Sequence, residues 1–249
     1  QSQTSAQGQS LTAANTSRAG DTLVLNGVVS AFAPEGGEVR VRADIGTVLM
    51  RAVDGAVEIT LADSYPVTIE GDGPGNAVLR VSHPGLLMTA EGQDGAIGYT
   101  FAAPTLSITL ESFEAPEPFE ASFALTFAGI EGSYATSGTD ELEIGADFAA
   151  ESMTLAIAAQ DPAEPGKFIL DWTSADIAIT GGGVLVPGAI PSDDLPAMLR
   201  AGMIVETDYS LGATSIALDA ADENGAPVRA NVTFDGTSFG AGLAADAIS

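Results

Sequence analysis

The chain has no cysteine, a single histidine (His83) and a single lysine (Lys167) among its 249 residues. Imidazole, amine and thiol groups supply most nucleophilic and general-base chemistry near neutral pH. Their scarcity argues against the common catalytic designs, and a zinc site is not expected from one histidine without cysteine. We therefore expect a protein that is not an enzyme.

Positive charge is also scarce. Lys and Arg together number 8 against 34 Asp and Glu, which gives a formal net charge of −26 and a sequence pI of about 4.1. Such a chain repels the phosphate backbone, so we expect no nucleic-acid partner. The same charge opposes adsorption to anionic membrane surfaces. A solvated acidic surface is the simplest interpretation of the carboxylates, and a cation site is the alternative.

Long apolar runs are missing as well. No run reaches the roughly 18 residues that a membrane-spanning helix needs, so no transmembrane segment is expected. The chain begins QSQTSAQGQS, which indicates the interior of a longer chain or a processed terminus. The absence of cysteine fits a reducing or an oxidising compartment and does not choose between them.

What the sequence does contain is alternation with a period of two from Asp21 onward. The clearest runs are 39–45, 57–61, 67–70, 106–111, 119–127 and 153–157. A period of two places apolar residues on one face of a strand and polar residues on the other. Gly-, Pro- and Asp-rich turn signals separate the runs. The fold class is therefore mainly β: an antiparallel meander of one-sided strands that forms a curled sheet, a sandwich or a barrel.

The organisation along the chain follows from these patterns. We expect residues 1–20 to be a polar tail or the end of a helix, and residues 21–190 to form the main antiparallel β region. Residues 191–202 are expected to be a helical connection, with one short helix near 192–201 capped by Ser192 and stopped by Gly202. Residues 203–249 are expected to add further strands that continue the same sheet.

Carboxylates are the side chains of this sequence best suited to form a metal-binding or catalytic site. Asp219, Asp222 and Asn224, with Glu223 between them and Gly225 after them, form the densest acidic turn that follows a strand. Calcium prefers oxygen ligands, so these residues are the candidate calcium site, although the spacing of an EF-hand loop is not met. A hydrolase with paired carboxylates is a second possibility, but no one pair stands out among the 34 acidic residues.

Three further features are interpreted as structural. GTSFG (236–240) matches a nucleophile-elbow pattern at Ser238, but no histidine follows it in the chain. His83 lies in an HPG turn and is expected to make an ordinary structural hydrogen bond. Trp172 lies on an expected strand and is expected to be in the core or half-buried.

Several phrases of the chain resemble an uncharacterised family of alphaproteobacterial proteins that carry a secretion signal and a domain of unknown function. The phrases are SRAGDTLVLNGV (17–28), VEITLADSYPVTIEG (57–71), LRVSHPGLLMTAEG (79–92), YTFAAPTLSITLESF (99–113), FAGIEGSY (127–134) and DFAAESMTLAIAAQDPAEPGKF (147–168). The family is loosely similar to AsmA-type envelope proteins. This resemblance implies a periplasmic location, a curled sheet with an apolar interior, and a chain that is an N-terminal part of a longer protein. The location that we expect is periplasmic or extracellular. It supplies no functional residues.

The leading hypothesis is a non-enzymatic periplasmic β-scaffold or binding module that holds an apolar ligand or lipid against its inner face, with lipid or an envelope protein as partner. An extracellular or surface assembly subunit with weak calcium sites is the second hypothesis, and a carboxylate-based hydrolase is the third. Ligand identity and oligomeric state do not follow from the sequence.

Overall fold

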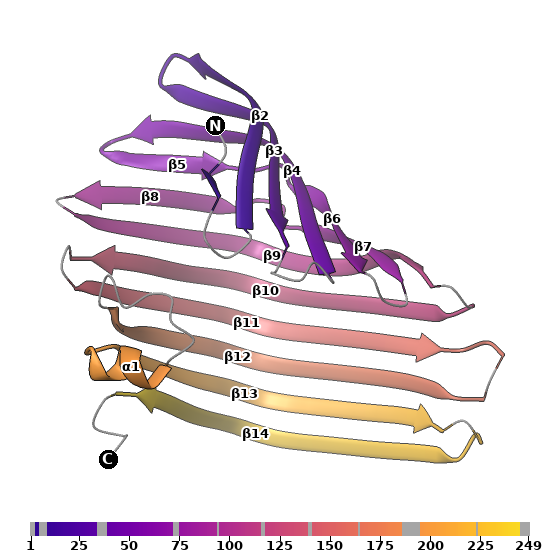
Figure 1. Ribbon diagram of the computed structural model, residues 1–249. Coiled ribbons are helices and arrows are strands. Elements are labelled where there is room, and N and C mark those ends of the chain that lie inside the picture. The colour runs from indigo at the N-terminus through magenta and orange to yellow at the C-terminus, as the bar shows by residue number, and fades with distance from the viewer. Residues whose placement is uncertain are drawn as a thin grey trace.

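The structure is a computed structural model that describes residues 3–4, 9–33, 39–71, 75–93, 95–115, 118–138, 141–163, 165–185, 195–222 and 224–244. The prediction of a mainly-β, antiparallel chain with one short helix is confirmed (Figure 1). All strands of the described residues belong to one 14-stranded sheet. Of the predicted curled sheet, sandwich or barrel, the structure has a single sheet.

The N-terminal part of the chain forms mostly short and bent strands, and the C-terminal part forms long ones. The first group is β1 (Gln3–Thr4), β2 (Gln9–Ala19), β3 (Thr22–Phe32), β4 (Val39–Val53), β5 (Ala56–Thr60), β6 (Ser64–Gly71), β7 (Asn76–Ser82) and β8 (Leu87–Gln93). The second group is β9 (Ala96–Glu114), β10 (Glu120–Ser137), β11 (Leu142–Gln160), β12 (Lys167–Leu185), β13 (Ile204–Ala221) and β14 (Pro227–Leu243), with helix α1 (Leu195–Arg200) before β13.

Two long strands each pair with two different neighbours on the same side. The first half of β4 pairs with β6 and its second half with β5. Likewise, the first half of β9 pairs with β8 and its second half with β7. Because β5 also pairs with β8 and β6 with β7, six strands form a hydrogen-bonded ring within the sheet. The sheet is therefore branched between β4 and β9 and is an unbranched meander from β9 to β14 (Figure 1).

Buried residues mark the places where the long strands of the ring pass from one partner to the next. Val48 lies on β4 between the halves that pair with β6 and β5, and it is 5% exposed. Ala103 occupies the corresponding position on β9, and His83 lies in the turn between β7 and β8. The backbone N–H of His83 donates to the carbonyl of Asp63 at 2.7 Å, which ties two turns of the ring together.

The prediction for residues 1–20 was wrong. Residues 1–20 were expected to be a polar tail or a helix end, but Gln9–Ala19 is strand β2, paired with β3 along its length. The polar Gln, Ser and Thr side chains are tolerated there because β2 is largely exposed, and its partner β3 supplies the apolar residues. A strand next to a sheet edge can hold its backbone hydrogen bonds without an apolar face of its own.

The helical connection is present as α1 over Leu195–Arg200, and residues 192–194 of the expected helix, with the predicted cap Ser192, lie outside the described residues. On either side of this connection, β12 and β13 are hydrogen-bonded neighbours, so β13 and β14 extend the same sheet. Among the described residues, no helix is long and apolar enough to cross a membrane.

Candidate functional site: an uncovered apolar face on β9–β14

The six long strands are each divided into two arms by one transverse row of residues. Strand register aligns these positions: Pro104, Gly129, Glu151, Asp176, Gly212 and Gly236. We call this row the crease. Three of its residues, on alternate strands, have left-handed backbone geometry, with φ of +58° at Gly129, +50° at Asp176 and +92° at Gly236.

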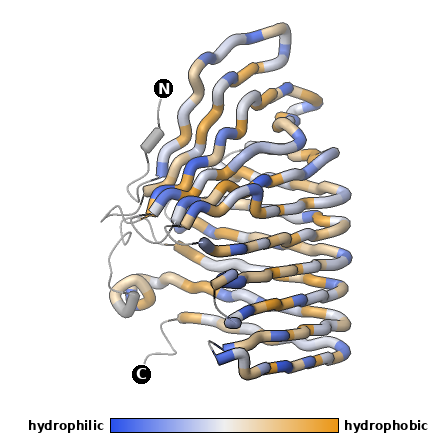
Figure 2. The backbone as a smooth tube through the Cα atoms, turned by 90° about the vertical axis from the view of Figure 1, so that its right-hand side faces the viewer, coloured by the Kyte–Doolittle hydropathy of each residue, from blue (hydrophilic) through white to orange (hydrophobic). Residues whose placement is uncertain are grey.

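Figure 2 shows β9–β14 nearly end on, with each strand bent about midway. The sheet therefore has a concave and a convex side. In the orientation of Figure 1, the right arms run from the crease to the turns that join β9 to β10, β11 to β12 and β13 to β14. The left arms run to the opposite ends. Positive φ at mid-strand changes the direction of the backbone at little cost when the residue is glycine.

Apolar residues occupy every second position in each arm and line one face. On the right arms they are the even-numbered residues of β9 (106–110), β12 (168–174), β13 (214–220) and β14 (228–234), and the odd-numbered residues of β10 (121–127) and β11 (153–159). On the left arms the parity is reversed: odd in β9 (97–103), β12 (177–183), β13 (205–211) and β14 (237–243), even in β10 (130–136) and β11 (144–150). We call these positions the apolar face.

The apolar positions change from odd to even numbers, or from even to odd, because each strand has one extra residue at the crease. Successive positions of the face are two residues apart along each arm but three apart across the crease, as from Phe127 to Ile130 or from Ala150 to Met153. If the apolar period of two continued unchanged through this extra residue, the apolar side chains of the second arm would lie on the opposite face of the sheet. The extra residue in every strand restores the same face to both arms.

Side-chain contacts across the crease confirm that both arms share one face. Phe127 of the right arm meets Phe148 of the left arm edge to face, with ring centroids 5.7 Å apart. Ala103, Ile130, Ala150 and Ile177 are buried in one cluster that includes residues of both arms. Side chains of two arms converge only on the side toward which a sheet bends, so the apolar face is the concave one.

The apolar face holds no charged residue. None of its positions on β9–β14 is Asp, Glu, Lys or Arg, although the chain as a whole has 42 such residues, 8 basic and 34 acidic. The charged residues of these strands lie on the convex face or at the crease, as do Asp147, Asp171 and Asp208. Its few polar groups are threonine, serine, tyrosine and tryptophan.

Among the residues that the structure describes, no second sheet covers the apolar face (Figure 1). Large side chains at its margins are open to solvent, with Phe239 58%, Val232 51% and Tyr134 40% exposed. The accessible surface of the chain is 15173 Å², whereas a compact monomer of this mass exposes about 10,000 Å². The excess is what a single-layered sheet produces, and an apolar surface of this extent commonly marks a binding site.

Neutral hydrogen bonds satisfy the polar groups near the crease. The indole N–H of Trp172 donates to Ser174 Oγ at 2.8 Å, and Ser174 Oγ lies 2.9 Å from Thr214 Oγ1. Thr214 Oγ1 in turn donates to the carbonyl of Gly212 at 3.2 Å. Ser174 and Thr214 are buried and Trp172 is half-buried, as the sequence predicted for the tryptophan. This chain of bonds joins β12 to β13 without placing a charge on the face.

Helix α1 lies beside the ends of β12 and β13, on the concave side of the bent strands (Figures 1 and 2). It carries Leu199, which at 1% exposure is the most deeply buried large side chain among the described residues. Met203, just after the helix, is 5% exposed. The helix therefore lies at one end of the face, by the left arms and away from the right arms (Figure 1).

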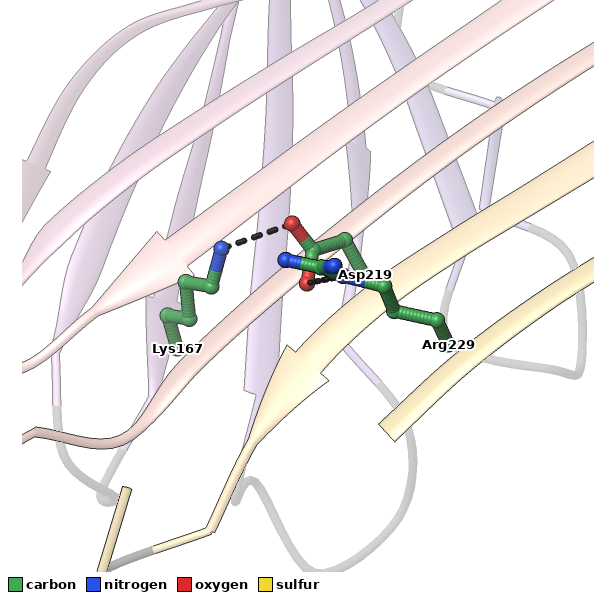
Figure 3. A network of polar contacts seen from close by, with 3 residues as sticks. All are labelled: Lys167, Asp219 and Arg229. Carbon is green, nitrogen blue, oxygen red and sulfur yellow. Dashed lines mark hydrogen bonds and ion pairs between the residues drawn. The ribbon is translucent and has the colours of Figure 1, made fainter. Parts of the chain in front are cut away.

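The predicted calcium ligands lie at the β13–β14 hairpin but point to different partners. Asp219 accepts a hydrogen bond from Lys167 Nζ at 2.7 Å and another from Arg229 Nε at 3.3 Å (Figure 3). The Lys167 hydrogen bond is the main reason that the pKa of Asp219 lies below its ordinary value. Sequence analysis did not connect these three residues, because Lys167 is 52 positions from Asp219.

Asp222 is engaged by the backbone of the turn. Its Oδ1 accepts hydrogen bonds from the N–H groups of Asn224 at 2.9 Å and Ala226 at 2.8 Å, which is the usual role of aspartate in a tight turn. Glu223 lies outside the described residues. Within the described ranges, no group of three or more His, Asp or Glu side chains is placed to hold a metal ion. The calcium site remains a prediction.

His83 differs from its predicted role. It lies in the expected turn, but it is 4% exposed, and neither ring nitrogen has a hydrogen-bond partner among the described residues. The imidazole instead packs against the ring of Tyr65, with centroids 5.6 Å apart and the planes at 61°. Burial raises the pKa of Tyr65 above its ordinary value. The histidine is a packing residue of the six-strand ring.

Comparison of the chain with protein-family models, with curated proteins and with solved structures finds no match. Sequence reasoning found the separate apolar arms, but it missed the crease. The signal that could have revealed it is the spacing of three residues recurring once in each long strand.

Proposed function

We propose that this protein is a non-enzymatic binding module of the cell envelope that holds an apolar ligand, of the class of lipid acyl chains, against the apolar face of β9–β14. The observation that carries the proposal is a concave face of six strands without a charged residue, in a chain whose net charge is −26. Solubility alone does not require that all charged residues be kept off one face of the sheet. The periplasmic location is part of the proposal and rests on the family resemblance.

The chemistry of the face suits hydrocarbon. Each apolar side chain that a ligand covers contributes about 25 cal/mol per Å² removed from water. A hydrocarbon chain forms no hydrogen bonds, and the Ser174 and Thr214 hydroxyls near the crease are already hydrogen-bonded to one another. A charged ligand group placed there would lose its hydration without meeting an opposite charge, which is strongly unfavourable.

The dimensions also suit an acyl chain. Six strands at about 4.8 Å spacing give a crease about 24 Å long. One leaflet of a bilayer has a hydrocarbon thickness of about 15 Å, half of the whole core. The crease floor includes the small side chains of Ala103 and Ala150, which are buried in the apolar cluster there, with larger apolar side chains on the two arms.

Two measurements test the proposal. Organic extraction of the purified protein followed by mass spectrometry should recover co-purifying lipid. Titration with a fluorescent acyl-chain probe should show saturable binding. The variant Leu155→Asp places a charge on the apolar face in the middle of β11 and is expected to weaken probe binding by about tenfold or more.

Thr154→Asp is the matched control, because Thr154 is the exposed neighbour of Leu155 on the convex side of the same strand. It should leave probe binding unchanged. Val232→Asp, at a position that is 51% exposed on the apolar face of β14, repeats the test where folding is less at risk. Equal binding by the wild type, the control and both face variants would refute the proposal.

An assembly subunit remains a second candidate, because β14 presents a long strand at one end of the sheet order. This second function goes with the predicted weak calcium sites. Sedimentation with and without calcium distinguishes the two functions, since an acyl-chain carrier needs no calcium-dependent change in mass.

A further inference from the structure

Within the described ranges, the last strand of the sheet is paired on one side only. β14 bonds to β13 from Pro227 to Leu243, and no other strand of the described residues pairs with it. Sixteen of its seventeen residues are exposed, and Phe234 alone is half-buried. An edge of this length presents a row of free N–H and C=O groups that can accept another strand.

β14 carries few of the features that usually protect an edge. Natural edges are blocked by short length, lysine, inward charges, proline or bulges that turn the strand away. β14 is 17 residues long, and its charged residues are Arg229 and Asp235 alone. Its single proline, Pro227, is at the start of the strand. Val228 and Val232 are 55% and 51% exposed, so the right arm of the edge is apolar on its concave side.

The bend at the crease restricts which partner fits. Because β14 turns at Gly236, where φ is +92°, a straight added strand can follow only one arm at a time. The right arm runs from Pro227 to Asp235, and an antiparallel copy of the same arm matches it in length. The midpoint of that match falls close to Val232.

Charge independently selects the same register. Arg229 and Asp235 lie three residues on either side of Val232. An antiparallel pair of right arms centred on Val232 therefore places Arg229 of each copy opposite Asp235 of the other. Directly opposed residues of an antiparallel pair project from the same face, so the two opposite charges meet twice across the junction.

Both charges are available for such a contact. The Arg229 side chain is 74% exposed, and its bond to Asp219 is the longer of the two that Asp219 accepts, at 3.3 Å against 2.7 Å from Lys167. Asp219 thus keeps a cation if Arg229 turns toward a partner. Asp235 is exposed and has no ion-pair partner among the described residues.

We propose that two copies of this chain associate through the right arms of β14, antiparallel about Val232, with reciprocal Arg229–Asp235 pairs. The two-fold axis stands perpendicular to the sheet, so the apolar faces of both copies lie on the same side. The continuous sheet then joins two binding faces. The interface is isologous, with the same patch used by both copies.

Sedimentation velocity over a range of protein concentrations tests this pairing at physiological ionic strength, where the repulsion between two acidic chains is screened. The expected result is a shift from the monomer mass of 25.0 kDa to twice that mass. Arg229→Asp and Asp235→Arg each create two like-charge contacts and should weaken dimerisation on the order of tenfold. The double variant exchanges the charges and should restore association to near the wild-type level.

Arg80→Asp is the control for the change in net charge, because Arg80 pairs with Glu111 on β9, away from the edge. It should leave dimerisation intact, and circular dichroism should confirm that each variant is folded. A wild type that stays monomeric at every concentration overturns the proposal. So does a double variant that remains as weak as the single ones, since only reciprocal pairing predicts rescue. Acyl-probe binding is measured separately, so failure of either proposal is seen without the other.

Discussion

Phe127 and Phe148 meet edge to face across the crease, with their ring centroids 5.7 Å apart and their planes at 86°. One ring belongs to the right arm of β10 and the other to the left arm of β11, and Phe148 also lies 6.5 Å from Phe101. The contact joins the two halves of the bent sheet. It is the closest described aromatic link between arms, so it should hold the bend as well as the apolar floor.

Phe148→Ala is expected to lower the free energy of unfolding by about 1–3 kcal/mol, less than for a fully buried phenylalanine because the ring is half-buried. Chemical denaturation monitored by circular dichroism measures this change. Thr154→Ala on the convex face is the control and should change stability by less than about 0.5 kcal/mol. Equal effects for the two variants would mean that the ring contact does not support the bend.

Gly129→Ala should destabilise the protein for two reasons that act together. The residue has φ of +58°, and a Cβ there would come 2.5 Å from the Cγ and Cδ atoms of Glu151. We expect a loss of about 1–3 kcal/mol in the free energy of unfolding. Gly145→Ala on β11 is the matched control, since a Cβ at Gly145 meets nothing within 4 Å. A neutral Gly129→Ala variant would show that the crease does not require the left-handed geometry.

The Lys167–Asp219 pair should contribute to stability in a pH-dependent way. Lys167, and to a lesser extent Arg229, lower the pKa of Asp219 below its ordinary value of 3.8, while desolvation opposes them. A carboxyl whose pKa is lowered on folding stabilises the folded state above its unfolded pKa. That contribution is lost as pH falls through the folded pKa.

Lys167→Met should therefore lower the melting temperature near neutral pH, and the difference from the wild type should shrink as the pH falls below about 3.8. Lys167→Arg keeps a cation and should behave more like the wild type. Thermal unfolding at several pH values measures the difference. A gap in melting temperature that is constant down to strongly acidic pH would contradict this role for the pair.

His83→Leu is expected to be neutral or stabilising by up to about 1 kcal/mol. Both ring nitrogens are buried without a hydrogen-bond partner among the described residues, so an apolar side chain of similar size removes an unsatisfied group. His83→Ala should destabilise, because it leaves a cavity beside Tyr65. Denaturant titration of both variants checks the order. Strong destabilisation by leucine would instead indicate a polar partner for the imidazole.

Asp222→Ala tests the hairpin and the calcium prediction together. The variant removes the acceptor for the N–H groups of Asn224 and Ala226 and should cost about 1 kcal/mol of stability. If calcium binds this turn, calcium should raise the melting temperature of the wild type more than that of the variant. Equal shifts, or none, would count against calcium at Asp222.

The arms of the long strands could be predicted from local patterning. Runs such as Leu106–Leu110 and Met153–Ile157 alternate with a period of two, which sets which side chains share a face whatever the partner strand is. The crease could not be predicted in the same way. A spacing of three residues interrupts the alternation and resembles the end of one strand and the start of another. Only neighbouring strands with aligned interruptions identify it as a bend.

The branch in the sheet could not be predicted from local sequence patterns either. β4 and β9 change partners midway, and this depends on pairing between segments that are distant in the sequence. The polar segment Gln9–Ala19 was mistaken for a tail or helix end because its own residues carry no apolar face. Its pairing with β3 supplies the backbone hydrogen bonds that decide its structure.

By itself, the sequence determined that one side of each strand is apolar and the other carries the charge, because that separation depends only on the two-residue period of an extended chain. Tertiary structure decided that the apolar sides of six strands join into one concave face, that the single lysine meets Asp219, and that β14 pairs on one side only among the described residues. These outcomes depend on strand register, on bends at aligned residues and on contacts over long sequence separations. None of them is fixed by the conformation of a short segment.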